Sequence, residues 1–315
     1  LLMGDVTMRI AKAVFAAIAL SLTVPALAQV APTDSEADGE TVAETVAPRG
    51  KVKVETVKFM SADGKNMING YVFTTDGATA RKPAIVMVHG RSGAYSSLAD
   101  GEYSAETLSS RHKMWGRMWA RHGYVAIMVD DFGALGFPKG FGRFTYDTRP
   151  KELDEVTIRP LHAYGALKYL KARADVDPKR IGLMGWSNGG SLTLAAMADD
   201  KPEGIREAGF KAGVSFYPGC GLKNRFERSG YKPYNPVLLM IGTGDVEVSA
   251  TSCERLVSLS RTRKGDIEIK LYKDAEHSFD TPTKARQSIP ANATAKEDAM
   301  ARTVAFFDEK MGVAK

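Results

Sequence analysis

Short apolar runs alternate with amphipathic stretches along most of the chain, a pattern that predicts alternating strands and helices. The runs at 84–88 and 237–241 are wholly apolar, as expected of strands buried on both faces of a sheet. Around Trp115 and Trp119 apolar residues recur at helical spacing instead, and Gly123 ends that predicted helix. The predicted strands are 52–60, 67–74, 84–88, 124–129, 181–186, 212–217, 237–241 and 267–272.

The order of these elements predicts an α/β protein with a mostly parallel, eight-stranded, doubly wound sheet. The first two strands should form an antiparallel pair, and the alternation of polar and apolar residues in 267–272 is typical of an edge strand. Further helices are predicted over 161–170, from 188 to 197, over 252–260 and, capped by Thr294, from there to 311. In such sheets the active site lies at the carboxyl ends of the strands.

The first fifty residues do not fit this pattern. Residues 1–28 resemble a secretory signal peptide, with basic Arg9 and Lys12, a short apolar stretch and a small-residue cleavage site ending at Ala28. A start at Met8 would make residues 1–7 a mis-called start. Residues 29–50 carry mostly acidic charge and few large apolar side chains, which predicts a flexible leader before a domain spanning 51–315. We therefore expect an exported protein, periplasmic or secreted, without a membrane anchor after cleavage.

The cysteine content agrees with an oxidising compartment. Cys220 and Cys253 could form a disulfide, or they could be two independent buried thiols. Export favours the disulfide.

Composition excludes several classes of function. The chain has 315 residues, of which 44% are hydrophobic and 25% charged, as is usual for a globular protein. The net charge of +6 comes from scattered Lys and Arg residues, so nucleic acid is not an expected partner. No metal-binding or nucleotide-binding motif occurs, and neither a metal nor another cofactor is expected.

One motif carries nucleophilic chemistry. Gly185-Trp186-Ser187-Asn188-Gly189 reads G-x-S-x-G at a predicted strand-to-helix junction, which is the setting of a nucleophile elbow. A serine hydroxyl is a weak nucleophile and needs an adjacent base that is oriented by an acid. Ser187 is therefore the predicted nucleophile.

The acid and base are expected after Ser187 in the chain, each at the carboxyl end of a strand. Asp245 and His277 meet both conditions and complete a predicted Ser-His-Asp triad. Glu247 is an alternative acid. His89 also ends a strand, but it precedes the serine and is in the wrong order for the base.

An oxyanion hole needs two donors. The predicted donors are the backbone N–H groups of Asn188 and of Arg91, which lies in the loop after strand 84–88. The Arg91 guanidinium could meet an acidic substrate group, but a surface salt bridge is the expected role. Tyr95, Trp186 and Phe132 lie near motif ends and could line a substrate pocket, although such aromatic residues are more often core.

The chain contains the motifs His89-Gly90, Gly185 to Gly190, Tyr217 to Cys220, Gly242 to Asp245 and Ala275 to Phe279. Together these motifs resemble the dienelactone hydrolase-like family, and the resemblance covers about residues 51–312. It implies an α/β-hydrolase fold, no cofactor, and hydrolysis of esters or lactones. The founding members of that family use cysteine as nucleophile, whereas this chain has Ser187, so dienelactone itself is an insecure substrate.

The predicted function is hydrolysis of a small-molecule or polymer ester through an acyl-enzyme. The Gly-Trp-Ser-x-Gly elbow together with export also resembles secreted polyester hydrolases. A peptidase or amidase using the same triad is an alternative, and a non-catalytic binding module is disfavoured because no triad member is missing. The sequence predicts no oligomeric state.

Overall fold

The predicted strands pair into one sheet in the computed structural model, which describes residues 50–76, 80–143, 145–201 and 203–313. Within these residues the sheet has eight strands in the order β1-β2-β4-β3-β5-β6-β7-β8. The strands are β1 (Val52–Met60), β2 (Met67–Thr75), β3 (Lys82–Val88), β4 (Val125–Asp130), β5 (Val176–Trp186), β6 (Gly213–Phe216), β7 (Val237–Gly242) and β8 (Ile267–Tyr272).

The pairing directions agree with the sequence prediction. β1 pairs antiparallel with β2, and β2 pairs antiparallel with β4. All the other neighbours, from β4 through β3 to β8, are parallel. The carboxyl ends of β3 and β5 to β8 therefore lie along the same edge of the sheet.

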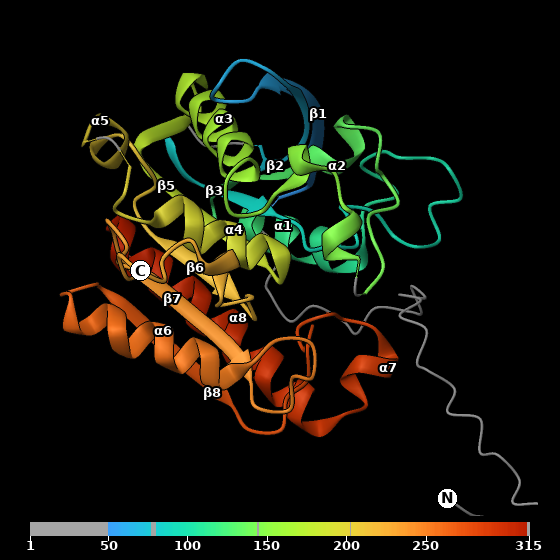
Figure 1. The fold of residues 1–315 in the computed structure, drawn as a ribbon. Coiled ribbons are helices and arrows are strands. Elements are labelled where there is room, and N and C mark those ends of the chain that lie inside the picture. Colours follow the sequence, from blue (N-terminus) through green and yellow to red (C-terminus); the bar gives the residue numbers. More distant parts are fainter. Residues whose placement is uncertain (1–49, 77–79, 144, 202, 314–315) are drawn as a thin grey trace, which may run out of the picture. The chain divides into compact units, whose positions relative to one another are not determined.

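Helices cover both faces of the sheet (Figure 1). α1 and α8 lie on one face, where the rings of Trp119 and Phe307 pack with centroids 5.6 Å apart, and α3, α4 and α6 lie on the other. The α-helices are α1 (Ser110–Arg121), α2 (Asp131–Ala134), α3 (Arg159–Ala172), α4 (Asn188–Met197), α5 (Glu203–Glu207), α6 (Ala250–Thr262), α7 (Lys284–Gln287) and α8 (Pro290–Met311). Short 3-10 turns span Tyr146–Thr148, Lys151–Leu153 and Leu222–Asn224.

The start of the last helix differs from its prediction. α8 begins at Pro290, not after Thr294, and no side chain caps its first turn. Proline suits a first helical turn because its fixed φ is already helical and its missing N–H would have no partner there. The capping-box pattern at Thr294 is therefore interior to the helix.

The interior is continuous across the sheet. Strands β3 and β4 are buried almost throughout, as their apolar sequences predict.

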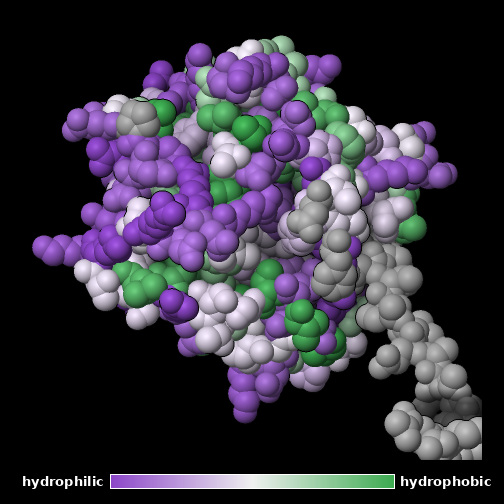
Figure 2. Space-filling view, in the orientation of Figure 1, coloured by the Kyte–Doolittle hydropathy of each residue, from purple (hydrophilic) through white to green (hydrophobic). Residues whose placement is uncertain are grey.

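In the described ranges no helix combines the length and apolar character that crossing a membrane requires. Figure 2 shows a face covered largely by hydrophilic side chains, with apolar residues in small separate patches. The predicted signal peptide and nearly all of the predicted leader, at residues 1–49, lie outside the described residues.

Candidate active site

Ser187 lies at the sharp turn between β5 and α4. Its backbone has φ 53° and ψ −115°, a strained conformation for a residue with a side chain. The turn is so tight that a Cβ built on Gly185 would lie 2.3 Å from the carbonyl oxygen of Gly189. The glycines of the G-x-S-x-G motif thus permit a close approach of strand and helix, and Ser187 occupies the position of the nucleophile in an elbow.

An imidazole and a carboxylate from two neighbouring loops approach Ser187. Nε2 of His277, in the loop after β8, lies 2.9 Å from Oγ of Ser187. Nδ1 of the same ring lies 2.7 Å from Oδ2 of Asp245, in the loop after β7. The side chain of Asp245 is buried and that of His277 nearly so. The structure brings together the three residues that chain order and strand ends had selected.

The alternative acid, Glu247, has a different environment. Its carboxylate pairs with Arg91 at 3.2 Å and with Arg143 at 2.8 Å. It approaches Nε2 of His277 only to 3.9 Å, while Nδ1, the nitrogen that an orienting acid must bind, is taken by Asp245. Glu247 therefore lies beside the imidazole without orienting it. The pair with Glu247 also agrees with the expected salt bridge of Arg91.

The loop that carries His277 is held by a residue that the sequence analysis did not select. The backbone N–H of Glu276 donates to Oδ1 of Asn292, in the first turn of α8, across 2.8 Å. Asn292 is fully buried, and its amide nitrogen donates to the carbonyl of Arg286. On the other side, the ring of Tyr217 lies 4.7 Å from the imidazole of His277. Asn292 could not be recognised from sequence because its partner, Glu276, lies in the loop before it and not in α8.

The two predicted oxyanion donors lie on segments that flank Ser187. Asn188 follows it directly, as the first residue of α4. The loop after β3 comes so close that a Cβ built on Gly90 would lie 3.4 Å from Cβ of Ser187, and Arg91 is the next residue. The two backbone segments expected to bind an oxyanion are thus adjacent to Ser187.

The three aromatic residues proposed to contact substrate lie in the core instead. Tyr95 donates its hydroxyl to Asp130 at 2.6 Å, and Trp186 donates its ring N–H to Asp280 at 2.8 Å. Phe132 is fully buried and packs edge-on against the ring of His89, with centroids 4.5 Å apart. Their polar atoms are engaged and their rings are covered by protein, so the structure corrects the expectation that they line a pocket.

Asp280 is a second unforeseen residue beside the site. Its carboxylate accepts hydrogen bonds from the indole of Trp115 at 2.9 Å and from Trp186. Its other oxygen accepts from the hydroxyl of Tyr217 at 2.5 Å. Burial raises the pKa of Tyr217 well above its ordinary value, so this hydroxyl remains protonated and donates. Asp280, three residues after His277, thereby ties the His277 loop to Trp186 at the end of β5 and to Tyr217 just after β6.

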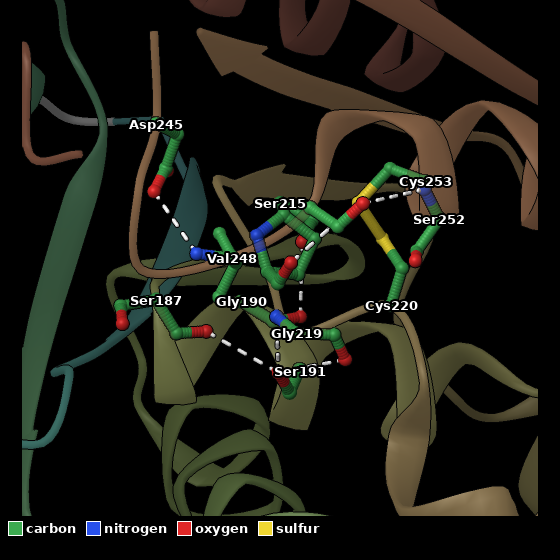
Figure 3. Close-up of a disulfide and its surroundings, with 12 residues drawn as sticks. Ser187, Gly190, Ser191, Ser215, Gly219, Cys220, Asp245, Val248, Ser252 and Cys253 are labelled. Carbon is green, nitrogen blue, oxygen red and sulfur yellow. Dashed lines mark hydrogen bonds between the residues drawn. A yellow bond between two sulfur atoms is a disulfide. The ribbon is translucent and has the colours of Figure 1, made fainter. Parts of the chain in front are cut away.

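Cys220 and Cys253 form a disulfide, with Cα atoms 5.0 Å apart. The bond joins the loop after β6 to α6, which begins just after the Asp245 loop (Figure 3). The neighbouring Gly219 donates its N–H to the hydroxyl of Ser191, in α4, at 2.9 Å. The disulfide thus links, through this loop, helix α4 after Ser187 to helix α6 after the Asp245 loop.

No cluster of three or more His, Cys, Asp or Glu side chains suited to a metal ion occurs among the described residues. What the site does contain is a serine hydroxyl, an imidazole and a carboxylate linked in that order, which is an arrangement able to activate the hydroxyl for attack on a carbonyl.

Sequence comparison identifies the family of the chain. A model of the dienelactone hydrolase family matches residues 68–311. The chain belongs to the dienelactone hydrolase family. It is therefore a hydrolase, and its sheet is that of the α/β-hydrolase fold.

Its relatives differ widely from this chain in sequence. The uncharacterized protein YfhR of Salmonella typhi is 26% identical over 316 aligned positions, which cover 87% of this chain and 96% of YfhR. A solved dienelactone hydrolase-like promiscuous phosphotriesterase from metagenomic libraries is 20% identical, with a TM-score of 0.60 over 82% of this chain and 99% of that one. A bacterial brefeldin A esterase is 16% identical, with a TM-score of 0.59 over 87% and 81%. At these identities the solved structures establish a shared fold.

Proposed function

We propose that this protein is an exported serine hydrolase that cleaves carboxylic esters, including lactones, through an acyl-enzyme. The observation that carries the proposal is the continuous chain from Ser187 Oγ to His277 Nε2 at 2.9 Å and from His277 Nδ1 to Asp245 at 2.7 Å. Such a chain allows the imidazole to take the hydroxyl proton as the serine attacks, while the carboxylate stabilises the resulting imidazolium.

In the first half of the reaction, Oγ of Ser187 adds to the ester carbonyl and His277 takes its proton. The negative charge on the tetrahedral oxygen is stabilised by the N–H groups of Asn188 and Arg91, with the amino end of α4 directed at the same point. His277 then returns the proton to the departing alcohol. In the second half, His277 takes a proton from water, which attacks the acyl-serine and releases the acid.

The proposed substrates are small-molecule or polymer esters. Esters are proposed ahead of amides because an alkoxide is a better leaving group than an amide nitrogen, so the acyl bond of an ester breaks more readily once Ser187 has added to the carbonyl. The family match supports hydrolysis in general, and the esterase among the solved relatives shows that this fold accommodates ester cleavage.

Export is proposed from the disulfide together with the predicted signal peptide. The Cys220–Cys253 disulfide suits an oxidising compartment. The predicted signal peptide supports the same location, with release to the periplasm or the medium.

The test is labelling with a fluorophosphonate followed by intact-protein mass spectrometry and assays on short p-nitrophenyl esters. Wild type should gain one phosphonyl group with loss of fluoride, and Ser187→Ala should gain none and hydrolyse no ester. Ser252→Ala, at an exposed position in α6, is the matched serine-to-alanine control and should label as wild type does. An unlabelled wild type, or ester hydrolysis by Ser187→Ala, would overturn the proposal, and cleavage of p-nitroanilides alone would replace esters by amides.

A further inference from the structure

Arg159, the first residue of α3, is completely buried. Burying a guanidinium costs free energy unless its N–H groups find hydrogen-bond partners and its charge is paired, so fully buried arginines are rare. Here it makes hydrogen bonds in three directions, and all three lead to segments around Ser187 or to the carboxyl end of β4.

The first direction leads to Asp131. Nε of Arg159 lies 2.7 Å from one carboxylate oxygen and its terminal nitrogen 3.1 Å from the other, a bidentate pair. Burial alone would raise the pKa of Asp131, but the charge of Arg159 and hydrogen bonds from His162 and His89 hold that pKa well below its ordinary value. The carboxylate therefore stays ionised and anchors the guanidinium beside β4.

The other two directions lead to the predicted oxyanion segments. One terminal nitrogen donates to the side-chain oxygen of Asn188, which follows Ser187. The other donates to the backbone carbonyl of His89 at 3.1 Å, two residues before Arg91. A single planar group thus holds the first residue of α4 and the loop after β3 at a fixed separation.

We propose that Arg159 is a positioning residue that sets the distance between the two oxyanion donors, the N–H groups of Asn188 and Arg91. This inference rests on the proposed esterase function. An oxyanion donor is effective only when it lies about 2.7–3.1 Å from the tetrahedral oxygen, so a small shift of either segment weakens it. Since the ground-state ester needs these bonds far less than the transition state, loosening the segments lowers kcat and leaves KM nearly unchanged.

Arg159→Lys separates positioning from charge. Lysine keeps the positive charge for Asp131 but presents one nitrogen instead of a planar fork, so it cannot bind all three partners at once. We expect kcat for p-nitrophenyl esters and the rate constant of fluorophosphonate labelling to fall about 30- to 300-fold, somewhat less than the roughly 100- to 1000-fold loss caused by removing an oxyanion donor outright, with KM changed less than about 3-fold. The matched control is Arg173→Lys, which alters an arginine paired with Asp175 away from the site and should change neither rate.

Asn188→Ala is the second variant, because it cuts one link to Arg159 without altering the backbone N–H of residue 188. It should lower kcat in the same way, and combining it with Arg159→Lys should give less than the product of the two effects. Each kcat is divided by the fraction of sites titrated with fluorophosphonate, so that unfolded protein does not count.

The outcomes separate the two proposals. A wild type that neither labels nor hydrolyses esters contradicts the proposed function itself. A reactive wild type with unchanged per-site kcat in Arg159→Lys overturns the positioning role and leaves the esterase proposal standing. If Arg159→Lys does not fold, Asn188→Ala decides: a per-site loss of kcat with KM unchanged supports the inference, and an unchanged per-site kcat overturns it.

Discussion

The backbone N–H of Glu247 donates to Oδ1 of Asp245 across 2.8 Å, so one candidate acid helps to orient the other. A second N–H, from Val248, reaches the same oxygen at 3.0 Å. With Oδ1 fixed in this way, Oδ2 of Asp245 points to Nδ1 of His277. The geometry therefore favours Asp245 as the acid and gives Glu247 a part only through its backbone.

This relationship predicts different effects of two isosteric changes. Asp245→Asn should lower kcat by roughly 10⁴-fold, because an amide no longer holds the imidazole in the tautomer that accepts the serine proton. Glu247→Gln should cost less than about 10-fold, because the amide replaces only a partner of Arg91 and Arg143 and the orienting N–H remains. The kcat of both variants with p-nitrophenyl acetate checks this. A larger loss for Glu247→Gln would reassign the acid.

Periodicity and motif order predicted the sheet and the hydrogen-bonded series Ser187, His277 and Asp245. They succeeded because each signal is local: an apolar run marks a buried strand, and a short motif marks its carboxyl end. Parallel pairing then brings the ends of β5, β7 and β8 to one edge whatever lies between them. The strand boundaries shifted by only a few residues, as at β6, which begins at Gly213 and not at residue 212.

The supporting residues could not be predicted in the same way. Arg159, Asp280 and Asn292 act through partners distant in the sequence, such as Trp186 for Asp280, and nothing in their local patterns marks them. The aromatic residues near the motifs failed for the opposite reason. Proximity in sequence to Ser187 suggested a pocket, but Trp186 ends a buried strand and its side chain turns into the interior.

The disulfide should contribute substantially to stability. It closes a loop with a sequence separation of 33 residues. On the chain-entropy estimate, a loop of this size is worth about 3–4 kcal/mol in the free energy of unfolding. Cys220→Ser and Cys253→Ser should each lose an amount of this order in urea unfolding, and the double variant should lose no more than either. Dithiothreitol should destabilise wild type but not the variants. If the reductant leaves wild type unchanged, the two cysteines are thiols in solution.

Gly189, two residues after Ser187, and Gly204 form a matched pair of helical glycines. A Cβ on Gly189, in α4, would lie 2.3 Å from the carbonyl oxygen of Val88, whereas one on Gly204, in α5, meets nothing within 4 Å. Gly189→Ala must push α4 away from β3. It should lower the free energy of unfolding by at least the usual cost of overpacking, about 1–3 kcal/mol, and it should also reduce kcat. Gly204→Ala should be neutral or stabilise by up to about 1 kcal/mol. Thermal unfolding and ester hydrolysis compare them, and equal effects would contradict the close approach at the elbow.

The buried pair of Arg159 and Asp131 predicts a pH dependence of stability. Asp131 has a pKa well below its ordinary value of 3.8 in the folded protein, chiefly because Arg159, His162 and His89 outweigh the opposing effect of burial. A carboxyl group whose pKa is lowered by folding stabilises the folded state fully above its unfolded pKa. That contribution is lost as the pH falls through the folded pKa.

Asp131→Asn should therefore destabilise the protein most at pH 6, by about 3–5 kcal/mol, because it leaves the charge of Arg159 buried without its partner. The difference in unfolding free energy between wild type and variant should narrow as the pH is lowered below about 4, since Asp131 then takes up a proton in the unfolded wild type while it stays ionised in the folded one. Urea unfolding at a series of pH values from 6 to 3 measures this difference. Asp177→Asn, at a partly exposed carboxylate paired with Arg180, is the matched control and should show a much smaller effect. A difference that stays constant across the series would mean that Asp131 contributes by hydrogen-bond geometry alone and not by its charge.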